Sequence, residues 1–240
     1  MRILPVDLNK DFNEAILESC RVLRASGTMI YPTDTAYSLG ANACDSVAVE
    51  KVFQIKNRHH SKPLPVLVRN LAWAKELAYI TPRQEKYLAS IWPQATAESL
   101  RGKPGPVTVI LPRREYLSAL TTANGMTVGL RVASYPFLDK LLAKLGYPLT
   151  ATSAKLFGEE ESNDINKVVT ALETSNRPFG SSARLTTSQT QGRQPNLVID
   201  AGILPKSLPA TILDLTSEEP KILRVGPTSP ELLRKLLGMK

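Results

Sequence analysis

The spacing of apolar residues along the chain changes repeatedly between that of a helix and that of a strand. Over residues 11–26 apolar side chains recur every three to four positions, which predicts a helix with one buried face, and Gly27 favours its end. The segment TMIYPTDT follows directly and is predicted to be a strand that ends in a turn. Asp45 or Ser46 can cap a second helix, which runs into the basic residues at 56–58.

The same alternation continues to the end of the sequence, so the pattern predicts an α/β fold rather than separate helical and strand halves. Further helices are predicted over residues 71–78, 82–91, 136–146, 164–173 and 229–237. Further strands are predicted for PLPVLV (63–68), VTVIL (107–111), TVGLRV (127–132), PLTAT (148–152), NLVID (196–200), ATILDL (210–215) and KILRV (221–225). The stretches 92–106 and 174–195 lack an apolar period and are predicted to be loops, the second of them mobile.

Length and charge narrow the class of protein. A chain of 240 residues can bury one sizeable core and has no internal repeat, so we expect one domain over residues 1–240. Lys and Arg number 30 against 22 Asp and Glu, and the resulting charge of +8 favours polyanionic partners such as nucleotides or RNA. No stretch approaches the roughly 20 apolar residues of a membrane-spanning helix. Since the N-terminus also lacks the pattern of a secretory signal, we expect a cytoplasmic protein with no membrane partner.

Metal and histidine chemistry have little support. Cys20 and Cys44 form no C-x-x-C motif, and we expect both to be buried, inert thiols. His59 and His60 are adjacent in one polar stretch, which disfavours a histidine-based triad. We therefore expect no dedicated metal site in the protein.

Any nucleotide must be held by side chains, because G-x-x-x-x-G-K-[ST] and G-x-G-x-x-G are both absent. Lys56 and Arg58 lie where the capped helix is predicted to end, with Lys62 close behind, so three cations gather before the strand at 63–68. Such a cluster suits phosphate oxygens, but it suits a solvated helix end equally well.

Three other positions allow both a ligand-binding and a structural interpretation. Arg131 is a charge inside the apolar strand TVGLRV, so it needs an open cleft with a ligand carboxylate or an internal ion pair. Thr35 ends the YPTDT turn, at the end of a strand where α/β sheets commonly hold ligands. Ser153 can donate to a phosphate or cap the following turn.

Several segments match the motifs of one known family in the same order along the chain. YPTDTAYSL matches Y-P-T-[DE]-T-x-Y-G-L, KNR matches K-x-R, and residues 62–64 match the K-P-L that follows. The motif W-P-G-P-x-T-x-x-L is split, with Trp92 and Pro93 separated from PGPVTVIL by an insertion at 94–103. TVGLRV, PLTATSAKLFG, PATILDL and KILRVGP complete the series. From about residue 13 to residue 227 the chain therefore resembles the YrdC-like family of threonylcarbamoyl-AMP synthases.

The resemblance implies an α/β fold with a twisted mixed sheet, flanked by helices, around a basic concave central site. It implies L-threonylcarbamoyladenylate synthase activity, a nucleotidyl transfer that forms threonylcarbamoyl-AMP and pyrophosphate from L-threonine, bicarbonate or CO2, and ATP. Mg2+ is then expected on the ATP phosphates. Because the product serves the N6-threonylcarbamoyladenosine modification of tRNA, the implied partners are the downstream tRNA threonylcarbamoyl-transferase machinery and, weakly, tRNA.

The resemblance also implies roles for individual residues. Lys56 and Arg58 would contact the triphosphate and act in catalysis. The expected ATP-binding residues are Lys56, Arg58, Lys62, Thr127, Ser153, Ser162 and Arg224. The expected threonine-binding residues are Thr35 and Arg131, with the Arg131 guanidinium clamping the carboxylate.

The chain departs from the family pattern at three positions of these motifs. Lys155 replaces the asparagine of S-A-N, Ala210 replaces the serine of S-T-[IV], and Ser38 replaces the glycine of Y-G-L. The sequence ends soon after LRVGP, so we expect the short form of the family, without the C-terminal domain of its longer members.

Two alternative functions stay open at this point. An RNA-binding maturation factor would use the basic cavity without chemistry, although aromatic residues for base stacking are few, with 5 Phe, 7 Tyr and 2 Trp. A degenerate relative that only binds ATP would account for Lys155 and Ala210.

Overall fold

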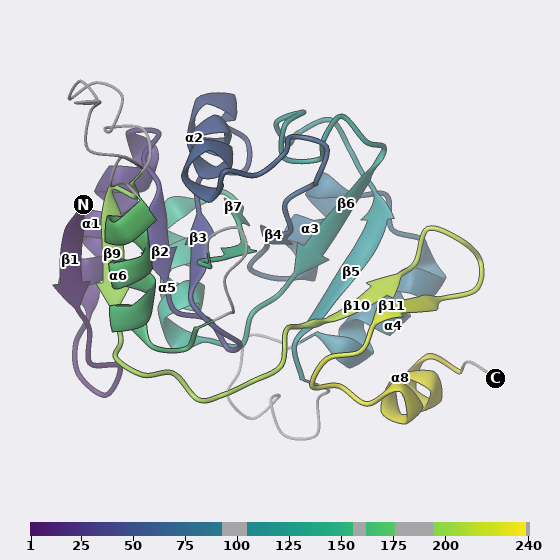
Figure 1. Cartoon of the computed structure of the whole chain (residues 1–240). Coiled ribbons are helices and arrows are strands. Elements are labelled where there is room, and N and C mark those ends of the chain that lie inside the picture. Colours follow the sequence, from purple (N-terminus) through teal and green to yellow (C-terminus); the bar gives the residue numbers. More distant parts are fainter. Residues whose placement is uncertain (93–104, 156–161, 176–193, 239–240) are drawn as a thin grey trace.

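The computed structural model describes residues 1–92, 105–155, 162–175 and 194–238. Within these ranges the chain forms an α/β fold with two mixed sheets that lie side by side and are flanked by helices (Figure 1). The predicted fold class is confirmed, and the single expected sheet is divided in two. The insertion at 94–103 lies outside the described residues, as does almost all of the loop predicted at 174–195.

The first sheet, sheet A, combines the N-terminal part of the chain with two later strands. Across the sheet its strands are β1 (Arg2–Pro5), β9 (Leu197–Asp200), β2 (Met29–Tyr31), β3 (Ser38–Gly40) and β8 (Thr152–Ser153). The pairs β1–β9 and β9–β2 are parallel, whereas β2–β3 and β3–β8 are antiparallel.

Helices cover sheet A on both faces. They are α1 (Asn13–Arg24) and α5 (Pro136–Leu145) on one face, and α2 (Ser46–Lys56) and α6 (Ile165–Ser175) on the other. Side chains of β2 alternate accordingly, because successive residues of a strand point to opposite faces. Met29 and Tyr31 are buried with α1 and α5, and Ile30 is buried with α2 and α6.

The second sheet, sheet B, contains the longest ladder of the fold. Across the sheet its strands are β11 (Lys221–Arg224), β10 (Thr211–Asp214), β5 (Val107–Pro112), β6 (Thr127–Arg131), β4 (Val66–Leu67) and β7 (Leu149–Thr150). The antiparallel pair β5–β6 runs in register from Thr108 opposite Arg131 to Pro112 opposite Thr127.

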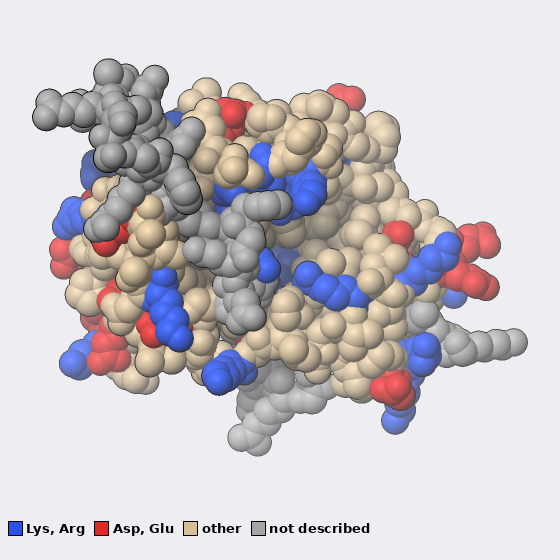
Figure 2. Space-filling view, viewed as in Figure 1, with Lys and Arg blue, Asp and Glu red and all other residues tan. Residues whose placement is uncertain are grey.

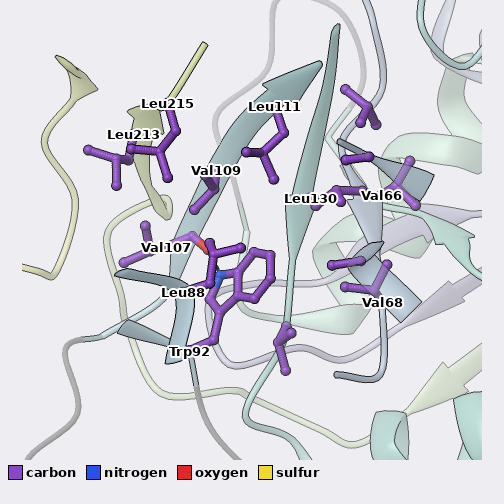
Figure 3. Packing of buried hydrophobic residues seen from close by; sticks show 14 of the residues in the cluster. Val66, Val68, Leu88, Trp92, Val107, Val109, Leu111, Leu130, Leu213 and Leu215 are labelled. Atoms are coloured by element: carbon purple, nitrogen blue, oxygen red, sulfur yellow. Dashed lines mark hydrogen bonds between the residues drawn. The ribbon is translucent and has the colours of Figure 1, made fainter. Parts of the chain in front are cut away.

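One face of sheet B is buried beneath α3 (Leu71–Leu77), α4 (Pro82–Ile91) and α8 (Pro230–Leu237). Figure 3 shows Leu88 and Trp92 against Val107 and Val109 of β5 in this core. The Trp92 indole Nε1 donates a hydrogen bond to the Val107 carbonyl oxygen at 3.1 Å, so its buried N–H is satisfied. No helix in the described ranges is long and apolar enough to cross a membrane.

The helix boundaries follow from residues that the sequence marks as caps. Asp45 is the N-cap of α2, because its carboxylate accepts hydrogen bonds from the Val47 and Ala48 amides at 2.9 and 3.2 Å. Gly146 ends α5 in the left-handed region, with φ of 79°, as its position after the apolar period predicted.

Three details differ from the sequence-based prediction. The segment PLPVLV pairs as a strand only over Val66–Leu67, since Pro63 and Pro65 have no backbone N–H to contribute to a ladder. Strand β1 was not predicted, because it is a largely exposed edge strand without an apolar pattern. The prediction of two buried thiols is wrong for Cys44, which is exposed.

The segment that contains β7 and β8 joins the two sheets. Its first strand pairs with β4 of sheet B, and its second pairs with β3 of sheet A. The Tyr31 hydroxyl donates to the Thr150 carbonyl oxygen at 2.8 Å, and the Thr150 hydroxyl accepts from the Ala41 amide at 3.0 Å. The Ala151 amide donates to the Pro65 carbonyl oxygen at 2.7 Å. These bonds fix the two sheets relative to each other.

Gly40 provides a test of this junction. A Cβ at Gly40 would lie 2.2 Å from the Thr150 carbonyl oxygen and 2.7 Å from the Tyr31 ring. We expect Gly40→Ala to lower the free energy of unfolding by about 2 kcal/mol in urea titrations, because the backbone must shift. Gly129→Ala is the matched control, since its Cβ would meet nothing nearer than 3.4 Å, and equal losses for the two variants would contradict the steric explanation.

Candidate functional site

A cavity of about 610 Å³ lies on the face of sheet B opposite its buried core. The alternation of side chains along β6 explains how one strand contributes to both. Val128 and Leu130 point into the core, whereas Thr127, Gly129 and Arg131 line the cavity. Gly129 has no side chain, so it leaves space between its two neighbours on this face.

The remaining walls come from distant parts of the sequence. β5 contributes Thr108 and Ile110, and the β10–β11 region contributes Pro209, Ala210, Ile212 and Arg224. The opposite wall consists of Thr35, Ala36, Tyr37 and Ser38 around β3, Arg58 and residues 61–65 after α2, and residues 151–153 with Lys155. The cavity therefore lies between the two sheets. Figure 2 shows Lys and Arg side chains bordering a hollow near the middle of this face.

Among the described residues, every charged residue that lines the cavity is a cation. Its lining includes three arginines and two lysines, namely Arg58, Arg131, Arg224, Lys62 and Lys155, and no carboxylate among the described residues. Like charges gathered around one hollow raise the local concentration of anions and favour a polyanionic ligand. Seven of the expected site residues line this cavity. Those expected to bind threonine are Thr35 and Arg131, and those expected to bind ATP are Arg58, Lys62, Thr127, Ser153 and Arg224.

Arg131 combines the two interpretations that the sequence left open. Its Nη2 forms an ion pair with an Asp34 carboxylate oxygen, and Nη1 and Nη2 lie 3.3 and 3.4 Å from the Thr35 hydroxyl. The other Asp34 oxygen accepts a hydrogen bond from the Ser134 amide at 3.2 Å. Arg131 is only 7% exposed, yet its side chain lines the cavity and its Nε has no partner within the described residues. A guanidinium at the wall of a cavity is suited to a carboxylate ligand, which it can bind through paired donors.

Asp34 is a residue of this site that the sequence reasoning missed. It is part of the YPTDT motif, whose two hydroxyls and one carboxylate allow a ligand-binding strand end or a plain turn, but the motif assigns Asp34 no role of its own. Its partner Arg131 is 97 residues away in the sequence, so the ion pair depends on the tertiary fold.

Arg58 and Arg224 are each held by backbone carbonyls at the cavity wall. Arg58 donates from Nε to the Lys62 carbonyl oxygen at 3.3 Å and from Nη2 to the Pro63 carbonyl oxygen at 3.0 Å. Arg224 donates from Nε and Nη2 to the Ala210 carbonyl oxygen at 3.0 and 2.7 Å. Burial lowers the pKa of the Arg58 guanidinium, but an arginine stays charged near neutral pH because its ordinary pKa is far above 7.

Two of the expected ATP-binding residues do not line the cavity. The Lys56 ammonium lies behind the wall and donates to the carbonyl oxygens of Ser153, at 2.6 Å, and of Lys155. The Ser162 hydroxyl donates to the Asp164 carbonyl oxygen at 3.2 Å and accepts from the Asp164 amide at 3.1 Å. Ser162 thereby closes a local turn that precedes α6.

The sequence motifs also did not identify the apolar and neutral residues of the lining, although the spacing of residues along a strand could have indicated some of them. Gly129 lies between Thr127 and Arg131 at the spacing of one strand face. Tyr37 could not be inferred in this way. Its hydroxyl donates to the Gly202 carbonyl oxygen at 2.8 Å and accepts from the Ala201 amide at 3.0 Å. Burial raises the pKa of this phenol, which therefore stays protonated and serves to hold the wall.

The three departures from the family pattern all lie at this cavity, since Ser38, Lys155 and Ala210 are part of its lining. Ser38 is an ordinary strand residue of β3 and does not have a positive φ, so its backbone does not need glycine there. Within the described residues no three His, Cys, Asp or Glu side chains are grouped so that they could hold a metal ion.

Comparisons with known proteins agree with the fold and with the order of the motifs. The model of the Sua5/YciO/YrdC family, whose description is "Telomere recombination", matches residues 21–226. Proteins named threonylcarbamoyl-AMP synthase are 28% identical over 90% of this chain in Pyrococcus abyssi and 28% identical over 93% of it in Bacillus subtilis. The chain spans 55% and 56% of the lengths of these two relatives. A protein of the same name from Vibrio vulnificus is 29% identical over 62% of this chain and 75% of its own length.

Solved structures of related proteins also match the fold of this chain. A P. abyssi Sua5 structure described as complexed with L-threonine has a TM-score of 0.81 and 25% identity, and the match covers 100% of this chain and 62% of that one. E. coli YciO has a TM-score of 0.74 at 23% identity, covering 97% of this chain and 98% of its own, which supports the fold alone.

The Asp34–Arg131 ion pair predicts a stability effect. Asp34→Asn leaves the buried guanidinium without its counter-charge, so we expect the free energy of unfolding to fall by about 2 kcal/mol in urea titrations. The matched control is Asp139→Asn, which removes an exposed ion pair with Arg69 and should cost less than about 1 kcal/mol. If the two substitutions cost the same, the pair has no special role in stability.

Proposed function

The chain belongs to the Sua5/YciO/YrdC family, and on this premise we propose that it is an L-threonylcarbamoyladenylate synthase. The proposed reaction forms threonylcarbamoyl-AMP and pyrophosphate from L-threonine, bicarbonate or CO2, and ATP. The observation that carries the proposal is the cavity itself, in which five cations, Arg131 among them, surround a space of about 610 Å³. The names of the relatives and the threonine-bound P. abyssi structure support the same substrates.

The proposed chemistry is a nucleotidyl transfer. The uncharged amine of threonine adds to CO2 and releases a proton to solvent to give a carbamate, and a carbamate oxygen attacks the α-phosphorus of ATP. The bond between the α-phosphorus and the bridging oxygen breaks, and pyrophosphate leaves with that oxygen. This reaction needs positioning and charge neutralisation rather than a covalent intermediate on the protein, and those are the functions that a fixed cationic cavity provides.

In the proposed amino-acid site, Arg131 binds the threonine carboxylate. Asp34 and Thr35 hold Nη1 and Nη2 of its guanidinium in a fixed direction, so little side-chain entropy is lost when the ligand binds. The Thr35 hydroxyl lines the cavity from the opposite wall and lies 3.3 and 3.4 Å from Nη1 and Nη2 of Arg131.

In the proposed nucleotide site, Arg58 and Lys62 on one wall and Arg224 on the other bind ATP. Both arginines are held by backbone carbonyls, which aligns the guanidinium planes before the ligand arrives. The other cavity residues proposed to contact ATP are Thr127 and Ser153. Mg2+ would bind with the phosphates, which supply the oxygen ligands that it prefers.

The proposed function implies further partners. The product is an activated carbamoyl group, so a transferase must carry it to tRNA, and we propose that the chain works with such machinery in the cytoplasm as one YrdC-like domain. Weak tRNA binding at the basic face would suit this exchange.

The reaction has a direct test. Purified protein with ATP and Mg2+ should release pyrophosphate only when both L-threonine and bicarbonate are present, in a coupled pyrophosphate assay. Release that does not depend on threonine would point to a different acceptor. No release above the background of a heat-denatured sample, combined with salt-dependent tRNA binding, would favour the RNA-binding alternative.

The division of the cavity into two subsites predicts opposite ligand effects for two arginines. Arg131→Ala should weaken threonine binding at least about tenfold in calorimetric titrations and leave ATP binding within about threefold. Arg58→Ala should do the reverse, because its guanidinium lies on the other wall. If both variants lose both ligands to the same extent, the assignment of the subsites is wrong.

A further inference from the structure

Lys56 is a buried cation whose partners belong to the protein. It is the last residue of α2 and is only 6% exposed. Its ammonium donates to the Ser153 carbonyl oxygen at 2.6 Å and to the Lys155 carbonyl oxygen, and the side chain does not line the cavity. A buried ammonium is stable only when its donors are satisfied, and these two carbonyls satisfy two of its three donors.

The segment that Lys56 holds has few other anchors within the described residues. Strand β8 pairs with β3 over two residues only, and the Ala154 amide then donates to the Tyr37 carbonyl oxygen at 2.8 Å. The Lys155 carbonyl oxygen, the last group of this segment, is fixed by the Lys56 ammonium. Lys56 therefore determines where the residues from Ser153 to Lys155 lie against the cavity.

Lys155 lies at the cavity itself. It lines the cavity together with Arg58 and Lys62, and within the described residues its ammonium forms no hydrogen bond or ion pair. At this position the S-A-N motif would supply an amide, whereas SAK supplies a compact positive charge with three donors. An ammonium beside two other cations suits phosphate oxygens and cannot accept a hydrogen bond from a base.

We propose that Lys155 is a phosphate-binding residue of this cavity and that Lys56 is a positioning residue that acts through the Ser153–Lys155 segment. This inference rests on the proposed function, because it assigns the ATP phosphates to the wall that carries Arg58 and Lys62. On this proposal, the phosphate contact expected of Lys56, at the end of α2, is made instead by Lys155, in the segment that Lys56 holds.

The first test is Lys155→Met, with ATP and pyrophosphate each titrated by calorimetry. We expect about a tenfold loss of affinity for both, a weaker salt dependence, and unchanged threonine binding in the absence of nucleotide. The matched control is Lys86→Met on α4, an exposed lysine on the helix-covered side of sheet B, which should bind all three ligands as the wild type does.

The second test separates positioning from direct contact. If Lys56 acts through Lys155, Lys56→Met should cost much less ATP affinity in the Lys155→Met background than in the wild type, because the two substitutions share one interaction. Two independent phosphate contacts would instead give additive losses, and additive losses would overturn the role of Lys56. The Lys155→Met comparison does not depend on whether the Lys56 variant folds.

Failure of this inference can be distinguished from failure of the proposed function. Wild-type protein that binds no ATP and releases no pyrophosphate would remove both. Wild-type protein that does so, with Lys155→Met binding ATP and pyrophosphate equally tightly, would overturn the role of Lys155 and leave the proposed function intact.

Discussion

The site depends on the unequal covering of sheet B. Its strands must bury one face, and α3, α4 and α8 supply the apolar partners on that side. The other face of β5, β6 and β10 borders the cavity, so the period of two that places Val128 and Leu130 in the core also sends Thr127 and Arg131 to the ligand. A slip of one residue in the β5–β6 register would exchange these two sets, and the strong burial of the core side opposes such a slip.

Gathering several cations in one cavity costs free energy, and the contacts of each arginine with neighbouring groups offset part of that cost. Arg58 and Arg224 each bind backbone carbonyls, and Arg131 binds Asp34 and Thr35, so two of the three guanidinium nitrogens of each arginine have a partner before a ligand enters. Only part of the positive charge is neutralised in this way, because carbonyls are dipoles and, in the part of the chain that the structure describes, Asp34 is the single carboxylate in contact with these three arginines. The remaining field is therefore available to an anion, and the fixed geometry limits the entropy lost on binding.

The sequence predicted most elements because their signals are local. The Asp45 cap, the Gly146 stop and the apolar period of α5 each arise from neighbouring residues. It did not predict that the expected single sheet divides, since this depends on the 149–153 segment pairing first with β4 and then with β3. The same limit applies to the site. Motifs identified Arg58 and Arg131, whereas the Asp34–Arg131 pair could be found only in the folded chain.

The positions where the motifs differ from the family pattern show which requirements are chemical and which belong to the backbone. Ala210 presents its carbonyl oxygen to Arg224, a contact that any residue can make, so loss of a hydroxyl there leaves the arginine anchored. Ser38 pairs with Ser153 in an ordinary strand conformation, so the missing glycine requires no special backbone freedom. Lys155 is different, because the change replaces an amide with a charge in the lining itself. It is therefore at Lys155, rather than at Ala210 or Ser38, that this chain should differ from its relatives in how strongly it holds an anion.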